Sequence, residues 1–85
     1  MRLVDLPLHA PAIVIAIHAL GDADPVARRL GELGFVPGEA VEVRATGPIG
    51  REPLMVQVGY TRFALRRSEA ARIEVRAATA ELATA

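Results

Sequence analysis

The sequence predicts a small, mainly β domain in which about five antiparallel strands close a barrel, with one short α-helix between the first two strands. The chain has 85 residues, which is enough for one domain and not for two. Most apolar residues lie in short β-branched or alternating runs that are typical of strands, and only one segment has clear helical spacing. A chain this small can bury such strands by closing a barrel, which also removes exposed sheet edges.

The first strand is expected at residues 12–17, a short and mostly β-branched run. Its larger side chains fall on one face at period two and are expected inside the barrel: Ile13, Ile15 and Ile17. Residues 41–46 alternate between apolar and polar side chains and predict the second strand. The next segment, residues 47–53, contains two glycines and two prolines and is therefore expected to be a loop.

A helix is predicted between these two strands. Asp24 is suited to cap its N-terminus, and Pro25 to occupy its first helical position. The apolar residues that follow recur at i, i+4 and i+7: Val26, Leu30 and Leu33. Gly34 can adopt the left-handed conformation that ends such a helix, and Phe35 is expected to pack back onto its last turn.

A β-hairpin is predicted from residues 54–58 and 61–65, joined by a two-residue Gly–Tyr turn. A register that pairs Val58 with Thr61 places large apolar side chains opposite each other on one face: Val56 with Phe63, and Leu54 with Leu65. A slip of one residue would invert every side chain of one strand, so the agreement along the pair supports this register.

Residues 66–71 are expected to form one helical turn and residues 72–75 a last short strand. The alanine-rich residues 77–85 are expected to fray from the domain. Five short strands with one helix between the first two indicate an SH3-like barrel. Its predicted core consists of Ile13, Ile15, Ile17, Leu30, Leu33, Val41, Val43, Leu54, Val56, Phe63, Leu65, Ile73 and Val75.

The residues that carry chemistry argue against an enzyme and against a nucleic-acid-binding protein. Ten arginines balance ten acidic residues, so no large field of one sign attracts nucleic acid. Without cysteine or lysine, the chain has neither thiol chemistry nor a phosphate-binding loop that ends in lysine. Ser68, the only serine, has no histidine nearby in the sequence and is expected to cap the following helical turn. The longest nearly apolar run is too short to span a bilayer.

Divalent metal binding is the alternative that the residues themselves leave open. His18 ends the first strand and Asp22 follows in the next turn, so these two side chains are the candidate ligands, with His9 in a neighbouring connection. Two histidines without cysteine and without a His-x-x-x-His spacing give little support for a zinc site. We therefore expect no resident cofactor, and at most adventitious binding of a metal such as zinc.

One family combines these features in the same order along the chain. The segments concerned are a helix-to-turn signature, a valine-rich strand, a Gly/Pro-rich loop and the C-terminal elements: residues 29–38, 41–43, 47–54, 63–70 and 73–75, preceded by Leu6 and Pro7. They resemble the FeoA family, ferrous iron transport protein A, whose domain would span residues 1–76 here. The chain departs from the family pattern at residues 9–11, where a Pro–Gly turn is usual, and at residues 50–53, where the loop is one residue wider.

The resemblance implies an SH3-like fold without enzymatic activity. It also implies a cytoplasmic accessory or regulatory protein of ferrous iron uptake, which contacts a membrane permease that carries a cytosolic GTPase domain. Neither nucleic-acid binding nor direct membrane insertion is expected. The alternative function is direct binding of a divalent metal, as an iron sensor or chaperone, because histidine and carboxylate ligands suit iron(II).

Partner contact is expected through loops and outward strand faces, because loops on a rigid scaffold are common binding elements. Tyrosine, methionine and arginine are also enriched in interface cores. The predicted contact residues are Ile49, Arg51, Met55, Tyr60 and Arg62. The alternative docking face is the helix, with Arg28 and Glu32. A structural alternative also stands, in which Ile49 plugs one end of the barrel and the C-terminal residues cover Met55.

Overall fold

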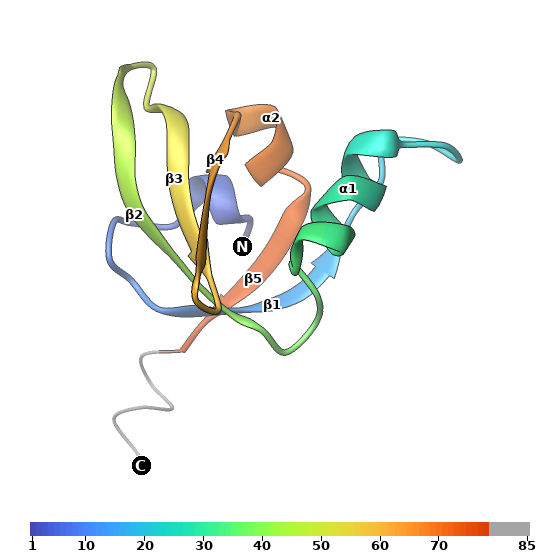
Figure 1. Cartoon of the computed structure of the whole chain (residues 1–85), viewed down its shortest axis with the longest axis horizontal. Helices are drawn as coiled ribbons and strands as arrows, with labels where there is room; N and C mark the ends of the chain where they lie inside the picture. The colour runs from blue at the N-terminus through green and yellow to red at the C-terminus, as the bar shows by residue number, and fades with distance from the viewer. Residues whose placement is uncertain (79–85) are drawn as a thin grey trace.

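The computed structural model describes residues 1–78, which form one curved, five-stranded antiparallel sheet with short helices around it (Figure 1). The elements in chain order are η1 (Leu3–Asp5), β1 (Ala12–Ile17), α1 (Pro25–Leu33), β2 (Ala40–Ile49), β3 (Glu52–Val58), β4 (Thr61–Leu65), α2 (Arg67–Ala70) and β5 (Ile73–Ala77). The strand order is β4-β3-β2-β1-β5, so β4 and β5 are the two edges of the sheet. No helix within residues 1–78 has the length and apolarity needed to cross a membrane.

Both predicted ends of α1 are confirmed. Oδ1 of Asp24 accepts hydrogen bonds from the backbone N–H groups of Val26 and Ala27, at 3.1 and 3.3 Å. These bonds satisfy two of the amides that the first turn of a helix leaves unpaired. At the other end, Gly34 has a φ of 117° and its N–H donates to the carbonyl of Gly31. Both ends of the helix are therefore set by residues whose capping role can be predicted from their type and position in the sequence.

The register of the β3–β4 hairpin is also confirmed. Val58 pairs with Thr61, Val56 with Phe63 and Leu54 with Leu65. Gly59, the first residue of the turn, has a φ of 58°, a conformation that glycine adopts readily.

The prediction of a loop at residues 47–53 is wrong. Strand β2 continues to Ile49, which pairs with Glu52 at the start of β3, so only Gly50 and Arg51 form the turn. Both turn residues have positive φ, 64° and 58°, as a type I′ hairpin turn requires. Gly47 is needed for close approach, because a Cβ there would lie 2.0 Å from the carbonyl oxygen of Glu52. Glycine and proline therefore permit an irregular hairpin here instead of ending the strands.

The inward face of β1 was predicted incorrectly. Ala12 and Val14 are buried, whereas Ile15 is 40% exposed and Ile13 and Ile17 are only partly buried. The two faces of this strand are both apolar, so period two alone does not distinguish them. A shift in the β1–β5 register between Val14 and residue 16 then changes the alternation along the strand.

The core lies between the sheet, η1, α1 and α2. The predicted core residues that are buried are Leu30, Val41, Val43, Leu54, Val56, Leu65, Ile73 and Val75. Leu33 and Phe63 are only half-buried, because they lie at the edge of the core where α1 meets β4. Leu3, Leu6 and Phe35 are fully or almost fully buried as well, although they were not among the predicted core residues.

The C-terminal elements differ from the prediction in their boundaries. The helical turn α2 is confirmed, but Arg66 occupies its N-cap position, so the prediction that Ser68 caps the turn is wrong. Strand β5 extends to Ala77, and Ala78 is buried, so the first two residues of the predicted frayed segment pack on the domain. The rest of that segment lies outside the described residues.

Candidate functional site

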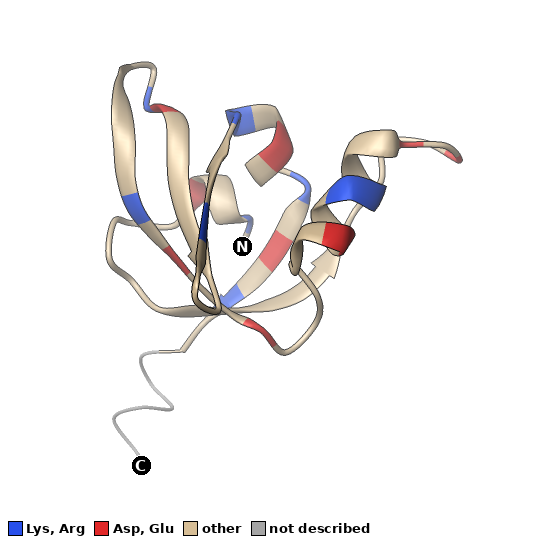
Figure 2. Cartoon of the chain, in the orientation of Figure 1, with Lys and Arg blue, Asp and Glu red and all other residues tan. Residues whose placement is uncertain are grey.

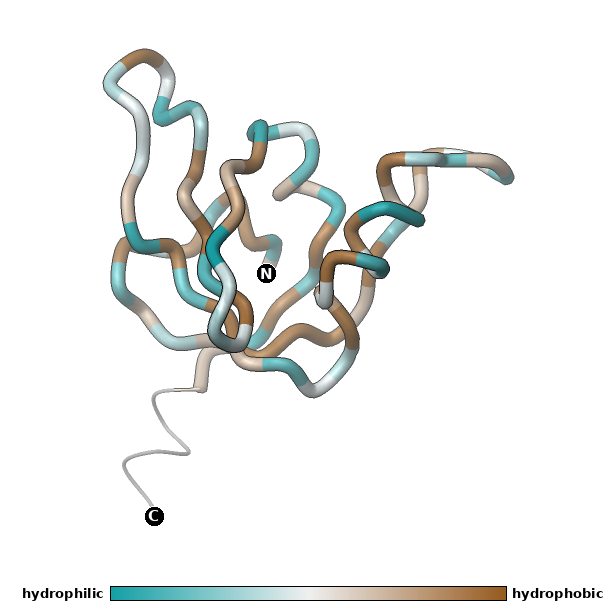
Figure 3. Tube along the Cα trace, in the orientation of Figure 1, coloured by the Kyte–Doolittle hydropathy of each residue, from teal (hydrophilic) through white to brown (hydrophobic). Residues whose placement is uncertain are grey.

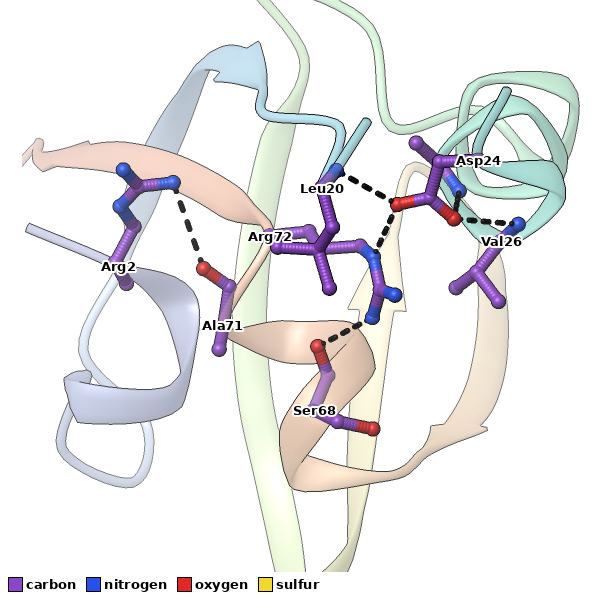
Figure 4. Close-up of polar contacts among 8 residues, drawn as sticks. Arg2, Leu20, Asp24, Val26, Ser68, Ala71 and Arg72 are labelled. Carbon is purple, nitrogen blue, oxygen red and sulfur yellow. Dashed lines mark hydrogen bonds and ion pairs between the residues drawn. The ribbon is translucent and has the colours of Figure 1, made fainter. Parts of the chain in front are cut away.

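A buried ion pair joins the start of α1 to the segment between α2 and β5 (Figure 4). Nε of Arg72 donates to Oδ2 of Asp24 at 2.8 Å, and the same oxygen accepts the backbone N–H of Leu20 at 3.0 Å. The Arg72 guanidinium also donates to the carbonyl of Ser68 at 2.8 Å. Only 7% of the Asp24 side chain and 11% of the Arg72 side chain are exposed. The pair therefore holds α1 in place against α2.

This arrangement favours the charged form of Asp24. The hydrogen bond from the Leu20 amide, followed by that from Arg72, lowers the pKa of Asp24 from 3.8 to about 2. Asp24 thus stabilises the helix N-terminus and neutralises an almost buried guanidinium at the same time. Asp24 therefore helps to position α1, and α1 forms one side of a groove.

The α1–β4 groove lies between these two elements and has a volume of about 590 Å³. Its apolar lining comes from Val26, Leu30 and Leu33 on α1 and from Phe63 and Leu65 on β4. Arg29, Arg62 and Arg66 line it as well, together with one acidic residue, Glu69 of α2. Of these polar residues, only Arg62 was among the predicted contact residues. The others share no local sequence signal, because the groove exists only when α1 lies beside β4.

The predicted contact residues do not form one patch. Ile49 and Arg51 lie at one end of β3 and Tyr60 and Arg62 at the other, about 20 Å apart for a strand of this length. Met55 lies between them and is half-buried. Arg62 lines the α1–β4 groove, whereas Ile49 and Arg51 belong to the β2–β3 hairpin tip.

Ile49 does not plug the barrel within residues 1–78, since it is 84% exposed. Figure 3 shows an apolar segment at the tip of the projecting β2–β3 hairpin. Tyr60, in the opposite turn, is fully exposed. On α1, Arg28 and Glu32 are exposed and do not line the groove.

The candidate metal ligands have different surroundings from those expected. Nε2 of His18 and Oε1 of Glu74 form a hydrogen bond of 2.6 Å, and this bond lowers the pKa of Glu74. Asp22 lies exposed in the following turn, and His9 is 3.7 Å from the Glu42 carboxylate. Across residues 1–78, no three histidine or acidic side chains gather as a metal-binding group. Sequence reasoning missed Glu74 because it is 56 residues from His18.

A five-stranded antiparallel sheet with this helix placement defines an SH3-like domain. The FeoA domain model matches residues 1–77, and the chain therefore belongs to the FeoA family. No match was found among curated proteins.

Solved structures of several bacterial proteins are similar to this chain. The FeoA of Stenotrophomonas maltophilia is 58% identical, with a TM-score of 0.83 and coverage of 89% of each chain. That protein was crystallised with zinc and is described as a prokaryotic SH3 domain protein with a suggested role as a ferrous iron transport activating factor. The FeoA protein of Chlorobium tepidum is 32% identical, with a TM-score of 0.79 and coverage of 91% of this chain and 70% of that one.

Two further solved structures with a similar fold belong to longer chains. The iron(II) transport protein A of Clostridium thermocellum is 30% identical, with a TM-score of 0.81. The match covers 93% of this chain and 46% of that chain. The IdeR of T. acidophilum is 18% identical, with a TM-score of 0.72 and coverage of 91% of this chain and 33% of that chain. At that identity the likeness concerns the fold alone.

Proposed function

We propose that this protein is a non-enzymatic accessory or regulatory protein of ferrous iron uptake, which acts in the cytoplasm by contact with the GTPase-bearing membrane permease for iron. The observation that carries the proposal is the FeoA family match, which extends over residues 1–77. The similar Stenotrophomonas protein, whose description concerns activation of ferrous iron transport, supports it.

The surface offers side chains suited to protein contact. Ile49, the last residue of β2, and Tyr60, in the β3–β4 turn, are strongly exposed apolar or aromatic residues at opposite ends of β3. Arginine and tyrosine are enriched in interface cores, and Arg51 and Arg62 lie beside these two residues in the chain. Two separate contact regions on one rigid sheet would allow the protein to bridge parts of a larger partner.

The experiment is a binding measurement between the full chain and the purified permease in lipid nanodiscs. We expect saturable binding of the wild type. Ile49→Asp, Tyr60→Ala and Arg62→Glu should each weaken it at least tenfold, about 1.4 kcal/mol, with nearly unchanged melting temperatures. Absence of wild-type binding with and without guanine nucleotide would refute the proposal. Loss of binding in Arg28→Glu or Glu32→Arg alone would move the docking face to the outer side of α1.

Direct metal binding is the second candidate function. It is favoured by the zinc in the crystals of the 58% identical protein. In this chain, the short contact between His18 and Glu74 brings together two ligand types that suit iron(II). Anaerobic calorimetry with ferrous iron tests it: stoichiometric binding tighter than micromolar that His18→Ala abolishes would establish a metal-binding role.

A further inference from the structure

We propose that the α1–β4 groove binds a short acidic protein segment that also carries apolar side chains. The proposal rests on the proposed function in one respect, namely that the segment belongs to the cytosolic part of the permease. In this proposal the partner is recognised by the residues that line the groove. Only one of them, Arg62, was among the contact residues predicted from the sequence.

The floor of the groove is apolar and partly open to solvent. Val26 and Leu33 on α1 and Phe63 on β4 are half-buried, and all three pack against the core. Their remaining exposed surface faces a groove of about 590 Å³, within the roughly 300–1,000 Å³ range of sites that hold small ligands. A few apolar side chains of a bound segment would remove this surface from water.

The sides of the groove are basic, although the chain as a whole has no net charge. Arg29 on α1, Arg62 on β4 and Arg66 at the N-cap of α2 all line it. Figure 2 shows basic segments on these three elements. Within residues 1–78, the only acidic residue of the lining is Glu69, whose Oε1 already accepts the backbone N–H of Arg66 at 2.7 Å. The groove therefore has an excess of positive charge.

These arginines are available for a ligand. Within residues 1–78, none of the three forms an ion pair, and Arg62 makes only a long hydrogen bond of 3.4 Å to Gln57. By contrast, Arg72 is paired with Asp24 and Arg44 with Glu42. Free guanidinium groups beside an apolar floor favour carboxylates, which they bind through two parallel hydrogen bonds.

The walls of the groove are held in place before any ligand binds. The Asp24–Arg72 pair attaches one end of α1. At the other end of α1, the centroid of the buried Phe35 ring lies 6.0 Å from the centroid of the Phe63 ring, and the two ring planes are inclined by 52°. A preformed groove lowers the conformational entropy lost on binding.

Charge and apolarity together identify the occupant. A nucleic acid would match the arginines but not the aliphatic floor, and nucleic-acid-binding grooves usually present several aromatic rings for base stacking. An acidic segment with apolar side chains matches both parts of the lining. A second copy of this chain is a further possible occupant, which the experiment below detects.

The test compares two double variants of equal charge change in binding to the permease in nanodiscs. Arg29→Glu/Arg66→Glu reverses two groove residues, and Arg44→Glu/Arg67→Glu reverses two exposed residues outside it. We expect the first variant to bind at least tenfold more weakly and the second to stay within threefold of the wild type. Added salt should weaken wild-type binding because the contacts are partly exposed ion pairs. Melting curves of both variants check that they fold.

A second measurement reads the groove without the permease. A synthetic 12-residue peptide of leucine and glutamate is titrated into the labelled protein and followed by NMR, with a leucine–lysine peptide as its control. We expect the acidic peptide alone to shift the amide signals of α1 and β4, and the Arg29→Glu/Arg66→Glu variant to lose these shifts.

The outcomes separate the two proposals. If the wild type binds the permease and both double variants bind equally well, the groove proposal is wrong and the proposed function stands. If the acidic peptide binds the groove but the permease does not bind at all, the proposed function is wrong and the groove chemistry stands. Equal shifts with the basic peptide, tighter binding of single-stranded RNA, or a dimer in sedimentation that Arg29→Glu/Arg66→Glu dissociates would each overturn the proposed occupant.

Discussion

Helix α1 and the β2–β3 hairpin both project from the sheet, but they are held by different kinds of contact (Figure 1). The helix is attached by side chains distant in sequence, since Asp24 and Arg72 are 48 residues apart. The hairpin is held by its own strand pairing and ends in Ile49, which is 84% exposed. The surface of α1 therefore depends on the rest of the fold, whereas the hairpin tip depends mainly on its turn. Substitutions in α1's attachments should accordingly cost more stability than substitutions at the tip.

The largest loss is expected on the helix side, from Phe35→Ala. Phe35 is fully buried directly after α1, so its truncation should cost about 3–5 kcal/mol, a large part of a small domain's stability. Phe63→Ala is the matched control, because its ring is only half-buried and should cost clearly less. Urea unfolding of both variants measures the difference. Equal losses would mean that the two rings contribute alike and that burial does not distinguish them.

The next largest effect is expected from Asp24→Asn, and it should depend on pH. The folded state holds the pKa of Asp24 at about 2, below its ordinary value of 3.8, so the stabilisation is complete above pH 3.8 and is lost as the pH falls toward 2. The variant should therefore melt at a lower temperature than the wild type at neutral pH.

Calorimetry across this range provides the check. The difference between the two melting temperatures should shrink as the pH falls from 3.8 to about 2. Glu74, whose pKa is also lowered, leaves a pH dependence common to both proteins. A difference that stays constant with pH would show that the Asp24 charge does not hold α1.

A smaller effect is expected on the hairpin side, from Gly47→Ala. The added Cβ would lie 2.0 Å from the Glu52 carbonyl oxygen, so the two strands must move apart, at a cost of about 1–3 kcal/mol. Gly21→Ala is the control, because nothing lies within 4 Å of a Cβ there. Thermal melts compare the two; if Gly21→Ala were the more destabilising, the close strand approach at Gly47 would be wrong.

The smallest effect on stability is expected from Ile49→Ser at the hairpin tip. Its side chain is 84% exposed, so the change in unfolding free energy should stay within about 0.5 kcal/mol. Chemical denaturation measures this change. A larger loss would show that the tip packs against another part of the chain and that the contrast with α1 is smaller than the structure indicates.

Several features of the fold follow from short stretches of sequence. Helix α1 begins after Asp24, whose side chain accepts hydrogen bonds from amides of the first helical turn. It ends at Gly34, which adopts the left-handed backbone conformation needed there. The β3–β4 register follows from a two-residue turn and matched apolar faces. The same local reasoning failed at residues 47–53, because glycine and proline are compatible with an irregular hairpin as well as with a loop.

The candidate site was less accessible to such reasoning. Of the three groove arginines, only Arg62 was among the predicted contact residues, and another of those residues, Ile49, lies at the other end of β3. Arg29 and Arg66 have no local pattern that separates them from ordinary solvated arginines. Their common location depends on the placement of α1 beside β4.

The sequence alone thus determined the helix ends, the β3–β4 pairing and the family, because each depends on residues close together or on an ordered set of short segments. The tertiary structure decided which apolar face of β1 is buried, because both faces are apolar and only packing distinguishes them. It also decided the partner of Asp24 and the composition of the α1–β4 groove. Those contacts join residues far apart in the chain, so no local propensity selects them before the sheet brings their elements together.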